Sequence, residues 1–263
     1  MLRVAARRGP EGQQIGEFEH GIVGHAALAF VDVGHNEQPL RCDDGSAIVF
    51  NGEIYNWRAL NESHRLGARN DTQTLLLGLA RVGLEFIAEL DGQFAFVAQL
   101  TRSGRPTMTL VARDKWGICP LVFGKTAEGW LAIGSTTEIV RSAGVRDVKT
   151  VPAGTSARLD GTELAFDTWY SLPRVAADAQ RAIDPLEVRR FAWQRVQSRI
   201  PERPRELFTT LGGIDSQFVT TAVARELGAG FGGAVTVVPW SPAGEWGGDY
   251  PDAKATLDRL AAD

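Results

Sequence analysis

The pattern of expected secondary structure changes part-way along this chain of 263 residues, and the change constrains the fold more than any other feature. Residues 1–171 contain short apolar or alternating runs joined by turns, as expected for strands. Residues 172–185 carry prolines near both ends and few large apolar side chains, which is typical of a linker. Residues 186–263 show longer helical periodicity around a Gly-Gly break. Two domains joined by a linker are therefore expected.

The first domain is expected to be an α+β layered sandwich. Apolar spacing predicts a helix that begins at Thr72, with Asp71 capping its free amides. Short strands with one or two helices bury their apolar faces by forming layers. The strands are expected at residues 21–33, 46–50, 93–100, 107–112, 130–133 and 155–159.

The second domain is expected to be α/β. A helix at residues 185–198 precedes a strand at 207–210, a helix at 214–227 and a strand at 234–238. Gly212 and Gly213 separate the first of these strands from its helix. Because a strand, helix and strand in succession pair their strands in parallel, a parallel sheet follows.

Composition excludes several classes of protein. The formal charge is -4, with Lys+Arg 28 interspersed among Asp+Glu 32, so a basic face for duplex nucleic acid or a membrane surface is not expected. No apolar run approaches a membrane span or a signal peptide. Only Cys42 and Cys119 are present, and the four histidines lack metal-ligand spacing. A cytoplasmic protein without a disulfide framework or a metal site is predicted.

The sharpest local motif is Asn51-Gly52-Glu53, which follows an expected strand. The Asn51 amide and the Gly52 backbone N–H are groups that stabilise a developing oxyanion, and Glu53 is suited to accept from a substrate ammonium. The alternative is a plain Asn-Gly β-turn without chemistry. Spacing alone leaves both interpretations open.

Neighbouring motifs favour the chemical interpretation. The motifs are Arg8-Gly9-Pro10-Glu11-Gly12, Gln38-Pro39-Leu40, Asn51-Gly52-Glu53-Ile54-Tyr55-Asn56, Asn70-Asp71, Phe94-Ala95-Phe96 and Ala112-Arg113-Asp114-Lys115-Trp116-Gly117-Ile118-Cys119-Pro120-Leu121. In this order, they resemble the motifs of the glutamine-hydrolysing domain of asparagine synthetases, which are class II N-terminal-nucleophile amidotransferases. The resemblance covers Arg8 to about Gly154 and implies an αββα sandwich for residues 1–171.

The resemblance also implies roles for single residues. Asn51 and Gly52 match the oxyanion hole, and Glu53 and Asp71 match groups that hold the amino end of glutamine. Val31 matches a backbone contact to the same ligand. A capping role for Asp71 is compatible with ligand binding.

Residues 210–216 resemble the SGGxDS pyrophosphate loop of the synthetase half of these enzymes. Glycines at a strand end admit phosphate oxygens to backbone amides, and the next helix N-terminus favours their charge. ATP and Mg²⁺ are the cofactors that the family implies, with glutamine and an aspartate-like acid as substrates. The matching residues are Thr210, Gly212, Gly213, Asp215 and Ser216.

Several positions depart from the family. The family nucleophile is a cysteine freed by removal of the initiator Met, whereas residue 2 is Leu2. Ala27 stands where the arginine that binds the glutamine carboxylate is expected, and Leu211 replaces the first serine of SGGxDS. Asp263 falls within the part resembling the synthetase domain. We expect a domain without its first strand, a partial ATP-binding domain, and no glutamine hydrolysis by this chain alone.

Two further hypotheses remain open at this stage. One is an amide-forming synthetase without a nucleophile, of the β-lactam synthetase or lasso-peptide cyclase kind. The other is a non-catalytic remnant or gene fragment. Sheet edges expected to be exposed leave room for a partner chain or a homodimer.

Overall fold

The computed structural model describes the chain except residues 29–36, 102–105, 175–183, 201–206, 236–249 and 263. It divides into two compact units, Met1–Arg174 and Val175–Asp263, which are described separately below. Within the described residues, the search for a helix long and apolar enough to cross a membrane finds none.

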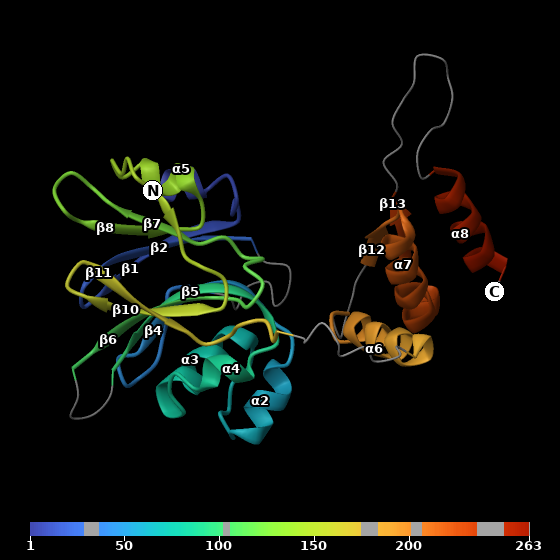
Figure 1. Ribbon diagram of the computed structural model, residues 1–263, viewed down its shortest axis with the longest axis horizontal. Coiled ribbons are helices and arrows are strands. Elements are labelled where there is room, and N and C mark those ends of the chain that lie inside the picture. Colours follow the sequence, from blue (N-terminus) through green and yellow to red (C-terminus); the bar gives the residue numbers. More distant parts are fainter. Residues whose placement is uncertain (29–36, 102–105, 175–183, 201–206, 236–249, 263) are drawn as a thin grey trace, which may run out of the picture. The chain divides into compact units, whose positions relative to one another are not determined.

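The first unit is organised around one six-stranded antiparallel sheet (Figure 1). Its strand order is β11-β10-β6-β5-β4-β3, so β6 and β5 are central and β4 lies between β5 and the short edge strand β3. Val49 of β4 is level with Val97 of β5, which in turn is level with Val111 of β6. The strands are β3 (Leu40–Arg41), β4 (Ala47–Ile54), β5 (Gly92–Leu100), β6 (Met108–Arg113), β10 (Thr155–Asp160) and β11 (Glu163–Thr168).

Helices cover one face of this sheet (Figure 1). They are α2 (Trp57–Ser63), α3 (Asp71–Arg81) and α4 (Phe86–Glu89). Alternate residues of the strands, among them Phe50, Phe94 and Phe96, pack with the buried helix residues into the main apolar core. Because successive side chains of a strand point to opposite faces, their sequence neighbours face the other way.

Two smaller sheets lie on that other face (Figure 1). The first pairs β1 (Gly12–Phe18) with β2 (Gly21–Ala27), and the second has the order β8-β7-β9. The short helices α1 (Leu2–Ala5) and α5 (Thr137–Arg141) pack on β2 and on β7 and β8 respectively. The layers therefore run helix, sheet, sheet, helix, and the predicted αββα sandwich is confirmed. The remaining strands are β7 (Val122–Lys125), β8 (Leu131–Gly134) and β9 (Lys149–Thr150).

The structure excludes one alternative and corrects one prediction. Asn51 and Gly52 do not form a β-turn, because β4 runs on through Ile54 and pairs them with Ala95 and Phe94. Nor is Asp71 the cap of α3. The cap is Asn70, whose side chain accepts from the Gln73 amide, and Asp71 is the first helical residue.

The second unit contains the predicted parallel pair of strands. β12 (Leu207–Thr210) pairs in parallel with β13 (Phe231–Val235), and α7 (Ile214–Leu227) connects them through the short 3₁₀ helix η1 (Gly228–Gly230). The second strand begins three residues earlier than the predicted residue 234, because Phe231 already pairs with Leu207. The helices α6 (Pro185–Gln197) and α8 (Tyr250–Ala262) complete the described part.

Candidate active site

A cavity of about 1190 Å³ lies in the first unit between the six-stranded sheet and the smaller sheets. Its floor consists of side chains from the face of the sheet that the helices leave uncovered, including Val49, Asn51, Glu53 and Val97. Its other walls include β2 and β8. Size and position suit a ligand site, because such sites are concave and mostly apolar with a few converging polar groups.

Asn51, Gly52 and Glu53 reach this cavity from consecutive positions of β4. Gly52 has φ of 142°, in a region that L side chains rarely adopt. A Cβ atom there would lie 2.0 Å from the carbonyl oxygen of Gln93 on the neighbouring strand. Only glycine fits, which explains in physical terms why the motif carries it.

Glu53 and Asp71 bring two carboxyl groups to the same cavity. Burial, with the Asp71 charge as a smaller cause, raises the pKa of Glu53 to about 7. Burial also raises the pKa of Asp71, although backbone N–H groups of Ile54 and Thr72 oppose the shift by donating to its carboxylate at 3.1 and 2.7 Å. A cationic ligand would stabilise the ionised form of both groups.

The structure places the predicted residues of the first domain together, with one exception. Asn51, Gly52, Glu53 and Asp71 all line the cavity, whereas Val31 lies outside the described residues. Ala27, at the position where the resemblance to asparagine synthetases leads us to expect an arginine, also lines it. A small apolar side chain there supplies no partner for a ligand carboxylate.

One cavity residue, Thr109 of β6, was not identified from the sequence. Its side chain is buried, at 6% exposure, and its hydroxyl has no hydrogen-bond partner within the described part of the chain. No sequence signal marks it, because a threonine in a strand is common. An unpaired buried hydroxyl costs free energy, and this hydroxyl oxygen is enclosed by protein rather than open to the cavity.

The two cysteines differ in position, but neither is activated. Cys119 lines the cavity, and burial raises its thiol pKa to about 11, with the Asp114 charge as the next cause. Cys42 is half-buried, and burial and the charges of Asp44 and Asp43 raise its pKa. A nucleophilic cysteine needs the opposite shift, since the thiolate is the reactive form.

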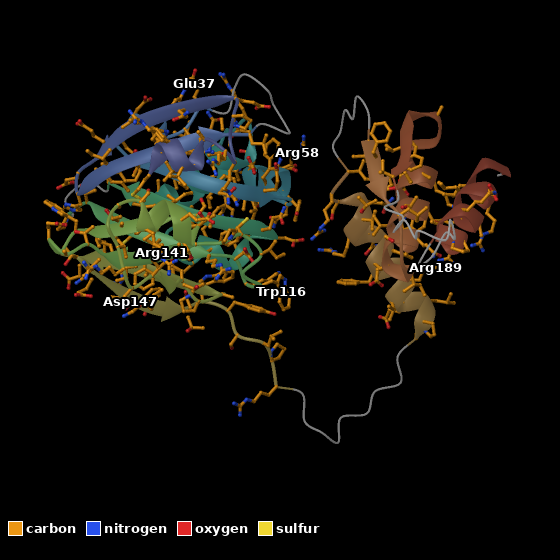
Figure 2. The ribbon with its side chains drawn as sticks, turned by 90° about the horizontal axis from the view of Figure 1, so that it is seen from above. Glu37, Arg58, Trp116, Arg141, Asp147 and Arg189 are labelled. Atoms are coloured by element: carbon orange, nitrogen blue, oxygen red, sulfur yellow. The ribbon has the colours of Figure 1, made fainter. Side chains whose placement is uncertain are left out.

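The Arg113-Asp114 motif builds the loop beside the cavity. Asp114 is fully buried and accepts from the amides of Phe94, Ile118 and Cys119, and from that of Trp116. Arg113 donates to the carbonyls of Gly117, Cys119 and Val151. Trp116 is left on the surface of the first unit, 53% exposed (Figure 2). The motif is therefore structural, and it places Cys119 in the cavity wall.

In the second unit, the predicted phosphate loop joins β12 to α7. The Gly212 amide donates to Ser216 Oγ at 2.8 Å, and Ser216 Oγ donates to the Gly213 carbonyl at 2.8 Å. Gly213 is the N-cap of α7 and makes no side-chain cap, while Asp215 lies exposed in the first turn. Thr210 is exposed and Leu211 is buried. An uncapped, exposed helix start preceded by glycine fits a phosphate group.

Comparison with known proteins gives the family to which the chain belongs. The family profile described as "Glutamine amidotransferase domain" matches residues 1–157. Asparagine synthetase [glutamine-hydrolyzing] 2 of Oryza sativa is 29% identical over 232 residues, which is 86% of this chain and 38% of the relative. Asparagine synthetase B of Escherichia coli is 27% identical over 228 residues, covering 84% of this chain and 40% of the relative.

A structural comparison finds glutamine phosphoribosylpyrophosphate amidotransferase from B. subtilis. The TM-score is 0.48 at 15% sequence identity, over 89% of this chain and 56% of that chain.

Most of the sandwich with its carboxyl-lined cavity falls within residues 1–157, the part of the chain that the amidotransferase profile matches. The chain belongs to the glutamine amidotransferase domain family, and its first unit is similar to the N-terminal domain of asparagine synthetases. It spans about two fifths of the length of these relatives, between 38% and 40%.

Proposed function

We propose that the first unit holds the amino end of glutamine or a related amino acid, as part of a protein that forms amides in the manner of an asparagine synthetase. The observation that carries this proposal is the convergence of Asn51, Gly52, Glu53 and Asp71 on one cavity. Glu53 and Asp71 accept from the ligand ammonium. Asn51 and the Gly52 N–H would donate to the side-chain carbonyl oxygen of the ligand.

Calorimetric titration with L-glutamine tests this assignment. We expect Glu53→Gln and Asp71→Asn each to weaken binding at least about tenfold, because each removes a charge-assisted bond. Asp147→Asn is the matched control, since that carboxylate is exposed on the surface of the same unit (Figure 2). Equal affinity in all four proteins would refute the assignment.

We further propose that neither cysteine of this chain serves as the nucleophile for glutamine hydrolysis. The raised thiol pKa values of Cys119 and Cys42 support this, because each thiol stays protonated near neutral pH. Ammonia release from L-glutamine by the purified chain is the measurement. A rate that Cys119→Ser or Cys42→Ser abolishes would contradict the proposal.

For the second unit, we propose that residues 210–216 belong to an ATP site, with Mg²⁺ as the accompanying ion. Gly212, Gly213 and the first turn of α7 would hold phosphate oxygens. ATP bound there would activate the carboxylate of an acid substrate by transferring its adenylyl group to it, with release of pyrophosphate. Asp215 is suited to orient an ion at the phosphates, and Thr210 lies at the strand end beside them.

Titration with ATP and Mg²⁺ tests this site. Ser216→Ala removes the hydroxyl that bridges Gly212 and Gly213 and is expected to weaken binding several-fold. Ser198→Ala, at the end of α6, is a control outside the loop. If the two variants bind ATP equally, the loop is not the site.

A second candidate is an amide-forming synthetase that dispenses with glutamine, of the β-lactam synthetase or lasso cyclase kind. Ala27 and the inactive thiols favour it, because both argue against glutamine chemistry in the cavity. ATP binding with no detectable glutamine binding would distinguish this candidate from the first.

A further inference from the structure

Gln38, in the Gln38-Pro39-Leu40 motif, holds strand β4 at the residue before Asn51. Its side chain is buried, at 6% exposure, and lines the cavity of the first unit. Its Oε1 accepts from the Phe50 backbone N–H at 2.6 Å. Because only the oxygen of a side-chain amide can accept from a backbone N–H, this bond also fixes which way the amide of Gln38 is turned.

The edge of β4 that faces away from β5 has little strand pairing. β3 pairs with β4 only at Ala47 and Ile48. The N–H groups of alternate residues in a strand point to the same edge, so those of Gly52 and Ile54 point the same way as that of Phe50. The bond from the Ile54 N–H to Asp71 Oδ2, at 3.1 Å, agrees with this direction.

Gly52 differs from its two neighbours along this edge. A side chain accepts from the Phe50 N–H and another accepts from the Ile54 N–H, whereas the Gly52 N–H has no acceptor within the described part of the chain. Gln38, Gly52 and Asp71 all line the cavity, so the cavity reaches this edge of β4. A strand held on both sides of one peptide group restricts the direction of the N–H between them. A donor that is already oriented loses less freedom when it binds an acceptor.

We propose that Gln38 is a positioning residue, which holds β4 so that the Gly52 N–H is presented to the cavity as a fixed main-chain donor. Without the bond to Phe50, the backbone around Gly52 would be held at this edge only by Asp71. The identity of the acceptor, the side-chain carbonyl of glutamine, rests on the proposed function. The orientation of the N–H does not depend on that function, because it follows from the bonds within β4 and its edge.

A pair of variants separates this role from ordinary structural support. Gln38→Met removes the acceptor while keeping a side chain of similar length and volume. Gln99→Met is the matched control, because Gln99 is also buried, at 8% exposure, its Oε1 also accepts from a backbone N–H, that of Glu19, and it does not line the cavity. Gln38→Glu keeps an oxygen acceptor and is the rescue variant. If Gln38→Met does not fold, Gln38→Asn and Gln99→Asn, which draw the amide back by one methylene, replace the pair.

The first readout needs no ligand. It is the order parameter of the Gly52 N–H, measured by ¹⁵N relaxation on the full chain. We expect a fall from about 0.85 to about 0.7 or below in Gln38→Met, and the parent value in Gln99→Met and Gln38→Glu. An unchanged value in Gln38→Met, or an equal fall in Gln38→Met and Gln99→Met, would overturn the proposal.

The second readout is the affinity for L-glutamine by calorimetry. Gln38→Met is expected to weaken binding at least about fivefold, because a loosely held donor binds its acceptor less well, whereas Gln99→Met should change it less than about twofold. Equal affinity of the parent and Gln38→Met would overturn the proposal. If the parent binds no glutamine while Gly52 loosens in Gln38→Met alone, the proposed function is refuted and the positioning role of Gln38 is supported.

Discussion

The two faces of the six-stranded sheet use the same strands for different purposes. Towards the helices, β4 and β5 present Phe50, Phe94 and Phe96, all at most 4% exposed, in a continuous apolar core. Towards the smaller sheets, their neighbours include Asn51, Glu53 and Val97, which line a cavity. On the face that the helices cover, closely packed apolar side chains stabilise the sheet. The opposite face encloses the cavity and carries polar side chains.

The largest difference between the faces should appear when adjacent side chains of β5 are shortened. Phe96→Ala is expected to lower the free energy of unfolding by about 3–5 kcal/mol, because it leaves a void in the packed core. Val97→Ala, on the cavity side, should cost about 1 kcal/mol, since it enlarges a space that already exists. Urea unfolding of both variants measures the two costs. Equal costs would show that the faces are packed alike.

The next effect concerns Gly52, where the cavity face meets the neighbouring strand. Gly52→Ala is expected to destabilise the fold by about 2–4 kcal/mol, because its Cβ would collide with the Gln93 carbonyl at an unfavourable φ. Gly67→Ala is the control, as Gly67 also has positive φ but has open space around it. It should cost about 1 kcal/mol. Thermal unfolding of the two variants separates the cost of the collision from the cost of backbone strain. Similar losses of stability in both variants would contradict a close approach between Gly52 and the Gln93 carbonyl.

A smaller, pH-dependent effect is expected at Glu53. Its pKa of about 7 in the fold lies above the ordinary value of 4.5, so the folded state takes up a proton more readily than the unfolded chain. The contribution of Glu53 to stability is therefore full below about pH 4.5 and is lost as pH rises through about 7. Glu53→Gln should be more stable than the parent by about 1–2 kcal/mol near pH 8 and equal near pH 4.

The measurement is a series of unfolding curves between those two pH values. The parent protein, unfolded at the same pH values, is the reference for each curve. A stability difference for Glu53→Gln that does not change with pH would argue against a buried carboxyl.

The smallest effect is expected at Thr109. Thr109→Val replaces an unpaired buried hydroxyl by a methyl group and should leave stability unchanged or raise it by up to about 1 kcal/mol. Thr155→Val is the matched control, because the Thr155 hydroxyl donates to the Pro152 carbonyl at 2.8 Å. Its removal should cost about 1 kcal/mol. If the two changes have the same sign, the Thr109 hydroxyl has a partner.

Much of the site was predictable from residue type and order. Asn51, Gly52, Glu53 and Asp71 were identified from the sequence and meet in one cavity. Their backbone conformation was not predictable, because the residues after Asn51 continue as strand β4 by pairing with β5. The turn propensity of Asn-Gly depends only on a short segment of the chain. Pairing of Asn51 with Ala95, which is 44 residues away in the sequence, overrides it.

The same distinction applies to residues whose role the sequence did not reveal. Arg113 and Asp114 belong to a motif that carries the family resemblance, and their partners are backbone groups that fold the loop around Gly117. Thr109 carried no signal, since its lack of a partner depends on what lies opposite in the folded chain.

By itself, the sequence determined the division into two domains of different class, the helix and strand periods, and the residues suited to bind an amine. Those properties depend on local spacing and on side-chain chemistry. Only the tertiary structure decided that one face of the sheet is filled while the other encloses a cavity, that Gly52 lies against Gln93, and that the Gln38 side chain holds β4 at Phe50. These features depend on packing between segments distant in the chain, which no local pattern specifies.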